Sequence, residues 1–268
     1  MPDWFEKTPI GELMDMAARR FETKEALCYE GNRWTFGQLK DEVDRVASGL
    51  IQLGIHPGEK VALWMPNRPE WIHSLFAVAK IGAVLVPINT RFRTNDLEYV
   101  VRQSDSETLI TVDRSGPVDY LGMVRELCPE VETGDPNRLC PEAFPELRRI
   151  VVLGDTNYRG TVRWEEILSS SGATPPRELE HRQQMVDPDS PALIMYTSGT
   201  TGFPKGVVHT HNILRNVNDE ANRMGMTPRD VILMYLPLFH AFGLYEGPLM
   251  SATTGARTVL TNAFDPGE

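Results

Sequence analysis

The sequence predicts a layered α/β fold in which parallel or mixed sheets are flanked by helices. Short apolar runs alternate along the chain with segments whose apolar residues recur at helical spacing. Parallel strands need a crossover connection, and a helix in that connection covers one face of the sheet, so this alternation favours parallel pairing. The 268 residues, 41% of them hydrophobic and 24% charged, suffice for one large domain or two ordinary ones.

The predicted elements begin with a helix behind Thr35. Thr35 and Gln38 have the spacing of a capping box, and apolar residues then recur at helical spacing up to Gly54, where the helix can end. A second helix is expected between Pro69 and Gly82, because proline suits the first turn of a helix. Short apolar runs predict strands at 61–65, 83–88, 108–112, 149–153, 192–196 and 207–211, and helical patterns predict helices from 94 or 95, around 118–127, at 164–168 and from 212.

Two stretches of the chain lack a regular pattern. Residues 115–145 are expected to form surface loops around the one short helix. Residues 177–191 are polar and end in prolines, which is typical of a connection between two halves of a fold. We therefore expect a first α/β subdomain over 1–176 and part of a second subdomain, carrying the loop discussed below, over 177–268.

Charge and composition exclude several classes of protein. The net charge of −10 has the wrong sign for a protein that binds nucleic acid through its phosphates. No apolar run reaches the roughly 18 residues of a membrane span, and the N-terminal residues do not resemble a secretory leader, so we expect a cytoplasmic protein. Three widely spaced cysteines, Cys28, Cys128 and Cys140, fit reduced thiols better than disulfides or a zinc site.

One stretch between two predicted strands has an unusual composition. Residues 197–206, TSGTTGFPKG, would form a loop held at both ends by these strands. Glycines let backbone N–H groups approach a ligand closely, hydroxyls donate to phosphate oxygens, and a lysine adds a mobile positive charge. A triphosphate is the ligand that this composition favours. The residues concerned are Thr197, Ser198, Gly199, Thr200, Thr201, Gly202, Lys205 and Gly206.

The loop matches neither of two well-known phosphate-binding patterns. Counted from Gly199, a Walker A motif would need a glycine before Lys205 and a serine or threonine after it, where this chain has Pro204 and Gly206. The glycine spacing of a dinucleotide-binding turn is also absent there. The alternative is a solvated hairpin turn with a surface lysine, and the concentration of hydroxyls and glycines argues against it.

The segment YTSGTTGFPKG resembles the phosphate-loop signature of the adenylate-forming superfamily, which includes the acyl-CoA synthetases. Residues 33–71, 81–110 and 236–250 resemble further segments of the acid–CoA ligases in the same order. The resemblance implies the N-terminal part of the acyl-CoA synthetase-like fold. It also implies an AMP-forming ligase that activates a carboxylic acid with ATP to an acyl-adenylate and then forms a thioester with coenzyme A. The apolar residues 241–244 beside His240 favour a fatty or aryl acid.

The same resemblance assigns roles to the loop and to one histidine. Residues 197–202 and Lys205 would hold the β- and γ-phosphates of ATP and the departing pyrophosphate, with Mg²⁺ sharing the charge. Lys205 would thereby assist a reaction that consists mostly of positioning and charge neutralisation. His240, in LPLFHAFG, would lie at the acyl end of the site, near the carboxylate. The alternative for His240 is a histidine that only packs or lines the core.

Two other histidines lie close together in the sequence. His209 and His211 would share one face of a strand and could suggest a metal pair, but no cysteine or carboxylate accompanies them at ligand spacing. We interpret them as structural residues that flank the loop, and expect no metal ligands in the protein.

Later motifs of the resembled family have no counterpart in this sequence. These are a Thr-Glu pair, a ribose-binding aspartate and a lysine in a mobile C-terminal domain. Residues 265–268, DPGE, are typical of a helix start. We therefore expect a truncated chain that is inactive alone and that self-associates through an exposed sheet edge. The alternatives are a stand-alone nucleotide-binding or regulatory module, a phosphotransferase, and an adenylating enzyme that uses a carrier-protein thiol in place of coenzyme A.

Overall fold

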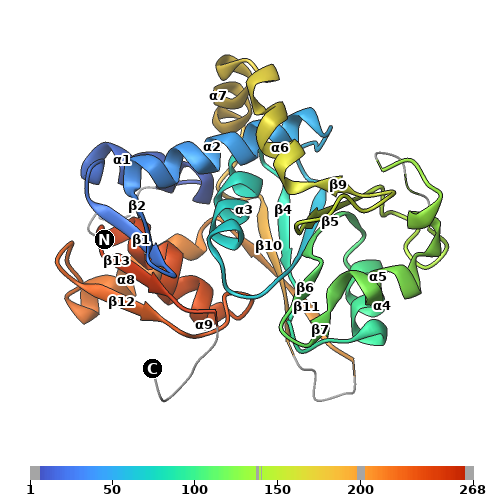
Figure 1. The fold of residues 1–268 in the computed structure, drawn as a ribbon. Helices are drawn as coiled ribbons and strands as arrows, with labels where there is room; N and C mark the ends of the chain where they lie inside the picture. Colours follow the sequence, from blue (N-terminus) through green and yellow to red (C-terminus); the bar gives the residue numbers. More distant parts are fainter. Residues whose placement is uncertain (1–6, 137–138, 140, 198–202, 263–268) are drawn as a thin grey trace.

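The predicted layered α/β architecture is confirmed by the computed structural model, which describes residues 7–136, 139, 141–197 and 203–262. Figure 1 shows a four-stranded sheet on the left and a larger sheet towards the centre and right, with helix α3 (Pro69–Lys80) between them. Every residue of α3 except Glu70 is buried, because this helix packs against neighbours on nearly all sides.

The larger sheet has seven strands and is mainly parallel. Only its edge pair, β10 and β11, is antiparallel. The apolar runs that predicted strands at 61–65, 83–88, 108–112 and 149–153 form its centre. In spatial order the strands are β11 (Lys205–Thr210), β10 (Pro191–Thr197), β4 (Val84–Pro87), β3 (Lys60–Trp64), β5 (Ser106–Val112), β8 (Arg149–Leu153) and β9 (Val162–Arg163).

The smaller sheet joins the two ends of the chain. Strand β1 pairs in parallel with β13, with Leu27 opposite Thr258, and antiparallel with β2. Its order is β12 (Val231–Met234), β13 (Arg257–Leu260), β1 (Glu25–Tyr29) and β2 (Asn32–Thr35). None of these four strands was predicted from the sequence: β1 and β2 are only five and four residues long and only partly buried, and β12 pairs with β13, which in turn pairs with a strand from the other end of the described chain.

The helices agree with the predicted segments in most places. The capping box of α2 is confirmed, since the Thr35 side chain accepts from the Gln38 amide and the Gln38 side chain accepts from the Thr35 amide. The turn β6 (Arg114–Ser115) to β7 (Val118–Asp119) shortens the predicted helix 118–127, which begins at Tyr120. The helices are α1 (Ile10–Phe21), α2 (Phe36–Gln52), α3, α4 (Thr94–Gln103), α5 (Tyr120–Leu127), α6 (Trp164–Ser170), α7 (Pro176–Gln184), α8 (Ile213–Met224), α9 (Ala241–Leu244) and α10 (Met250–Thr254), with 3-10 turns at Pro129–Glu132 and Ser171–Ala173 and a π-helical turn at Tyr245–Leu249.

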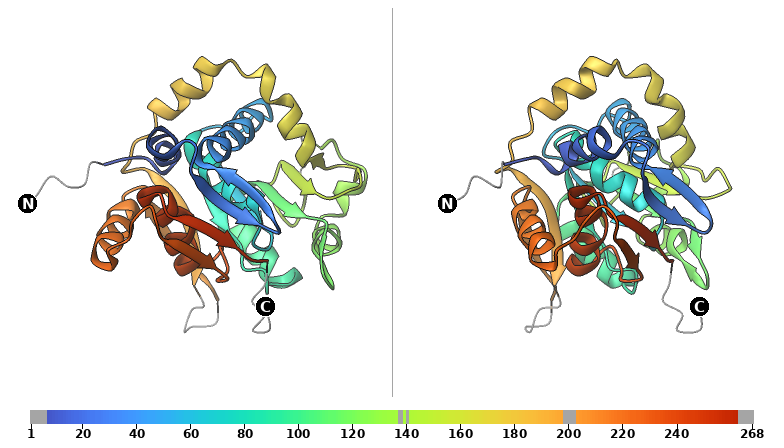
Figure 2. Two further views of the ribbon diagram at one scale, coloured as in Figure 1. Left: turned by 60° about the vertical axis from the view of Figure 1, so that its left-hand side comes forward. Right: turned by 90° about the vertical axis from the view of Figure 1, so that its left-hand side faces the viewer.

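Helix α7 corrects the expectation of an irregular connection over 177–191. Only Leu179 of this helix is buried, so its sequence has no apolar periodicity. Polar contacts hold it instead: Arg182 donates to Glu178 and, over 2.8 Å, to the carbonyl of Ile55. Figure 2 shows α7 running along the outside of the other helices before the chain enters β10.

The division into subdomains 1–176 and 177–268 stays a prediction. Both sheets include strands from either side of that boundary, since β10 and β11 extend the sheet of β3–β5, and β12 and β13 extend the sheet of β1 and β2.

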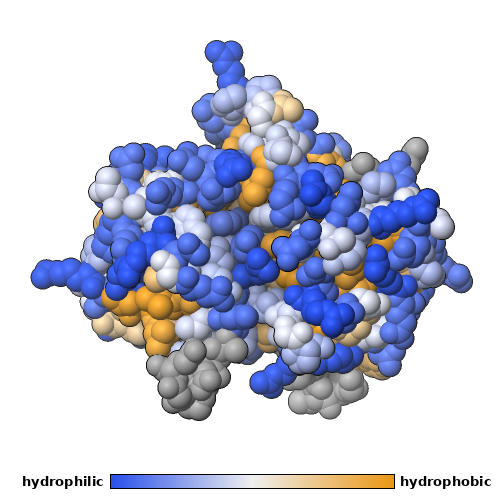
Figure 3. Space-filling model, in the orientation of Figure 1, coloured by the Kyte–Doolittle hydropathy of each residue, from blue (hydrophilic) through white to orange (hydrophobic). Residues whose placement is uncertain are grey.

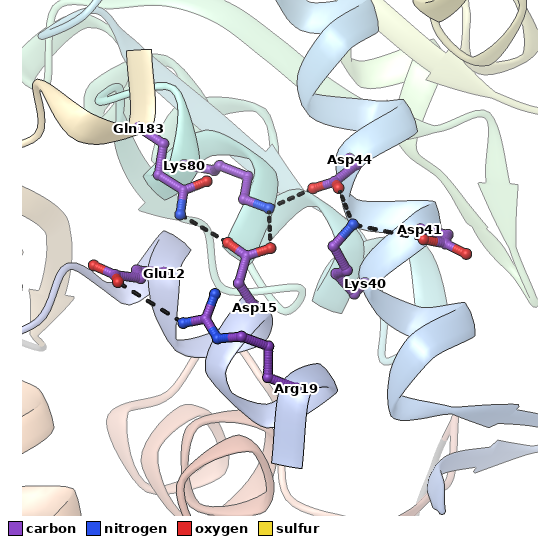
Figure 4. Close-up of polar contacts among 8 residues, drawn as sticks. All are labelled: Glu12, Asp15, Arg19, Lys40, Asp41, Asp44, Lys80 and Gln183. Carbon is purple, nitrogen blue, oxygen red and sulfur yellow. Dashed lines mark hydrogen bonds and ion pairs between the residues drawn. The ribbon is translucent and has the colours of Figure 1, made fainter. Parts of the chain in front are cut away.

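A buried cation ties four helices together. The side chain of Lys80, at the end of α3, is only 2% exposed; its Nζ lies 2.9 Å from Asp15 on α1 and also pairs with Asp44 on α2. Gln183 of α7 donates to the other oxygen of Asp15 over 2.7 Å (Figure 4). A buried charge is tolerated only where partners compensate it, so this cluster fixes how these helices pack.

Within the part of the chain that the structure describes, no helix combines the length and the apolar character that crossing a bilayer requires.

Candidate functional site

The two ends of the predicted phosphate loop meet in a β-hairpin. Thr197, the last residue of β10, lies opposite Lys205, the first residue of β11, and Tyr196 lies opposite Gly206. The predicted ten-residue loop is therefore too long, because Thr197, Lys205 and Gly206 belong to the strands. A Cβ on Gly206 would lie 3.3 Å from Cζ of Tyr196, so glycine leaves room for that ring.

Both described ends of the loop are exposed. Thr197 and Lys205 are open to solvent, and Lys205 has no ion-pair partner among the described residues. The hydroxyl and the ammonium group are thus available to an anionic ligand at the base of the hairpin. The remaining residues assigned to the phosphates, Ser198, Gly199, Thr200, Thr201 and Gly202, lie outside the described residues.

Helix α4 contacts Phe203 and Pro204, the two residues that lead from this loop into β11. The phenol of Tyr99 donates to the carbonyl of Pro204 over 3.1 Å, and its ring stacks on Phe203 with centroids 5.1 Å apart. One turn later Gln103 accepts a hydrogen bond from Tyr196, whose pKa is raised by burial to about 12, so its phenol stays protonated and can donate. Neither contact could be predicted from the sequence, since Tyr99 and Gln103 precede their partners by 105 and 93 residues and lie close to them only in the folded chain.

His240 begins the short helix α9. Its Nδ1 accepts a hydrogen bond from the backbone N–H of Phe242 over 3.2 Å, and its side chain is exposed. An acceptor nitrogen carries no proton, so a neutral His240 in this arrangement carries its proton on Nε2. The imidazole is therefore set up to donate a hydrogen bond from Nε2 to an external acceptor.

His209 links the hairpin to the segment that follows His240. The phenol oxygen of Tyr245, in the π-helical turn, lies 3.2 Å from Nδ1 of His209 and 3.8 Å from Sδ of Met195. Burial lowers the pKa of His209 and raises the pKa of Tyr245, so both groups are neutral near pH 7. Among the described residues, no hydrogen bond joins His240 to Thr197 or Lys205; the contact between Tyr245 and His209 joins the hairpin to the segment after His240.

His211 serves a different part of the fold. It follows β11, is 1% exposed, and its Nδ1 accepts from the backbone N–H of Ile10 over 3.0 Å. Burial lowers its pKa to about 4. His209 and His211 thus contact different segments, and the described residues contain no group of three histidine, cysteine or acidic side chains suited to a metal ion.

Asn67 reaches the site from the loop between β3 and α3. It is 6% exposed, and its carboxamide bonds to the chain just before His240, at Leu236 and Leu238. In the sequence, Asn67 was visible only as part of a Pro-Asn pair, and its contacts could not be predicted.

A cavity of about 470 Å³ lies at the opposite ends of the strands from Lys205. It is lined mainly by apolar side chains, with Lys60 and Arg182 at its rim. None of the predicted site residues lines it.

Comparisons with known proteins agree with the motif. A family described as "AMP-binding enzyme" matches residues 14–268. YngI of Bacillus subtilis, provisionally named an acyl-CoA synthetase, is 35% identical over 96% of this chain and 47% of its own length. The medium-chain acyl-CoA ligase ACSF2 of Homo sapiens, named as mitochondrial, is 32% identical over 97% of this chain and 43% of its own length. The chain thus spans about half the length of these relatives.

Solved structures show the same fold. The apo structure of MbtA from Mycobacterium smegmatis matches 97% of this chain and 45% of that one with a TM-score of 0.81 and 28% identity. The inhibitor-bound N-terminal domain of FACL13 from Mycobacterium tuberculosis matches 96% of this chain and 58% of that one, with a TM-score of 0.76 and 27% identity.

Proposed function

Because the chain belongs to the AMP-binding enzyme family, we propose that it supplies the phosphate-binding hairpin and one side of the acyl site of an AMP-forming acid–CoA ligase. The observation that carries this proposal is the hairpin itself: it joins the ends of a loop rich in hydroxyls and glycines and leaves Lys205 exposed at its base.

In the proposed reaction, the carboxylate of the acid attacks the α-phosphorus of ATP. The P–O bond to pyrophosphate breaks, which gives an acyl-adenylate, and the thiol of coenzyme A then displaces AMP to form a thioester. Both reactants of the first step are anions, so positive charge and hydrogen-bond donors must screen their repulsion. Thr197 and Lys205, with residues 198–202, would bind the β- and γ-phosphates and the departing pyrophosphate.

Magnesium would arrive with the triphosphate and share its charge. The ammonium group of Lys205 suits phosphate oxygens and repels a cation, and the exposed hydroxyl of Thr197 opposite it can donate to the same oxygens. We therefore assign phosphate contacts to Thr197 and Lys205 and no metal contact to either.

His240 would act at the acyl end. With Nδ1 occupied by the Phe242 amide, its Nε2–H would donate to a carboxylate oxygen of the acid and hold it for attack. The apolar residues beside it, exposed Phe242 and buried Leu244, favour a fatty or aryl acid. The name of the ACSF2 relatives favours a medium-chain acid.

Pyrophosphate release tests this proposal. The protein that carries this chain is mixed with ATP, Mg²⁺, coenzyme A and one acid at a time: a medium-chain, a long-chain or an aryl acid. Acid-dependent release of pyrophosphate and AMP is expected, most rapidly with a medium-chain acid. Release of ADP would support a phosphotransferase instead, ATP binding without release a regulatory module, and thioester formation only on a carrier protein the other adenylating class.

Two further expectations stay proposals. One is the cytoplasmic location. The other is self-association through an exposed sheet edge, for which β12 offers a surface: Val231 is 51% and Leu233 60% exposed on this edge strand. Figure 3 shows an apolar patch on the lower left, where Figure 1 places β12.

A further inference from the structure

Asn67 uses its whole carboxamide to join three segments of the chain. Its Nδ2 donates to the carbonyls of Leu236, over 2.9 Å, and of Thr261, over 3.2 Å, and its Oδ1 accepts from the amide of Leu238 over 2.9 Å. Leu236 and Leu238 follow β12, Thr261 follows β13, and Asn67 itself follows β3 of the other sheet. One buried side chain therefore connects the carboxyl ends of strands from both sheets.

The contacts of Asn67 continue to His240 through one turn. Leu236 and Leu238 flank Pro237, whose carbonyl accepts from the His240 amide over 3.1 Å. The same carbonyl lies against Gly243, where a Cβ would be only 2.2 Å from the oxygen. The position of Pro237 thus fixes both the start of α9 and the glycine that packs beneath it.

We propose that Asn67 is a positioning residue for His240. It holds the connection from β12 to α9 so that the imidazole caps Phe242 through Nδ1 and presents Nε2–H to the acid. The catalytic part of this inference rests on the proposed function, whereas the structural part does not. Only an amide fits this place, since an aspartate cannot donate to two carbonyl oxygens and would set a negative charge against them.

Amide hydrogen exchange tests the structural part. The variants are Asn67→Asp, which keeps the shape and loses both donors, and Asn67→Ser, which keeps a small polar group if the first variant folds poorly. The Phe242 amide, which reports the His240 cap, is expected to exchange about tenfold faster in both variants, as the loss of hydrogen bonds to a fixed loop implies.

Thr174→Val is the matched control. Thr174 is 5% exposed; its hydroxyl donates to the carbonyl of Ser48 and accepts from the side chain of Gln52, both on α2, in two part-buried hydrogen bonds. This variant should lower the melting temperature. The Phe242 amide should exchange faster only to the extent that global unfolding becomes more frequent. Unchanged local exchange at Phe242 in both Asn67 variants would overturn the inference.

Kinetics test whether Asn67 acts through His240. In the protein that carries this chain, Asn67→Asp should lower kcat for acid activation about tenfold and leave the KM for ATP unchanged, because the hydrogen bonds of Asn67 go to Leu236, Leu238 and Thr261 and to none of the described hairpin residues. The loss should disappear when His240 is already alanine. An equal loss in both backgrounds would refute positioning through His240. If His240→Ala alone leaves turnover intact, the role proposed for His240 fails while the exchange result still stands.

Discussion

The ring of Tyr99 on α4 stacks on Phe203 and its hydroxyl bonds to the carbonyl of the next residue, Pro204. Helix α4 thus fixes residues 203 and 204, through which the chain returns from the candidate phosphate loop to β11. The loop is anchored by tertiary contacts at its base as well as by the hairpin.

Replacing Tyr99 should therefore weaken ATP binding. Tyr99→Phe loses one hydrogen bond and should raise the Kd for ATP about 2- to 10-fold, since such a bond contributes about 0.5–1.5 kcal/mol. Tyr99→Ala also loses the ring contact and should raise it further. Calorimetric titration measures both. Tyr158→Phe, which removes a phenol bonded to Asp113 elsewhere on the surface, is the control. Wild-type affinity in Tyr99→Ala would show that the stack does not support the loop.

Lys205→Met should lower the rate of acid-dependent pyrophosphate release. A hydrogen bond to a charged group contributes about 1.5–3 kcal/mol, so the expected fall is about 10- to 150-fold. Lys60→Met removes a lysine at the other end of the sheet and should leave the rate unchanged. Equal rates in the Lys205 variant and wild type would remove this residue from the phosphate site.

Acid should destabilise the protein through His211. Its folded pKa of about 4 lies below the usual 6.5, so protonation favours the unfolded chain; its contribution is complete above pH 6.5 and is lost as the pH falls towards 4. The loss amounts to about 3 kcal/mol for a shift of this size. Thermal unfolding between pH 7.5 and 4.5 measures it.

A variant isolates this effect from a second buried histidine. Burial also lowers the pKa of His73 to about 4, so both residues act over the same pH range. His211→Gln should flatten the pH dependence and lower stability at pH 7.5 as well, because the Ile10 amide loses its acceptor. His73→Gln should flatten it without affecting that bond. A slope in His211→Gln as steep as in wild type would contradict this account.

Charge on the β12 edge should reduce self-association. Leu233→Lys places an ammonium group on the exposed apolar edge and should weaken any dimer about tenfold, which sedimentation velocity would detect. Met224→Lys, at a residue 60% exposed on α8 and off the strand, is the matched control. Monomeric wild-type protein at all concentrations would rule out the edge as an association surface.

Local sequence patterns predicted the helices and strands whose own residues carry a capping motif or an apolar run. Helix α2 carries its capping box, and the apolar runs of β3, β4, β5 and β8 reflect burial on both sheet faces. Helix α7 has neither signal, because polar contacts with distant residues hold it in place.

The residues of the candidate site also fall into those that a motif reveals and those that only the folded structure reveals. The hydroxyl- and glycine-rich loop and His240 could be identified from motifs, since their residue types reflect the chemistry. Tyr99 and Asn67 could not, because a partner 105 residues away and three partners 169 to 194 residues away leave no periodic trace.

The pairing of β1 with β13 also determines the order in which the two sheets can form while the chain is being synthesised. Leu27 is made about 230 residues before its partner Thr258, which at about 5–20 residues per second is a wait of roughly 10–50 s. During that time the edge of β1 that will bind β13 stays unpaired, and the larger sheet can acquire its β3, β4, β5 and β8 strands first. The small sheet is therefore the last to close, and nascent chains are most open to chaperones and to mispairing at the edge of β1.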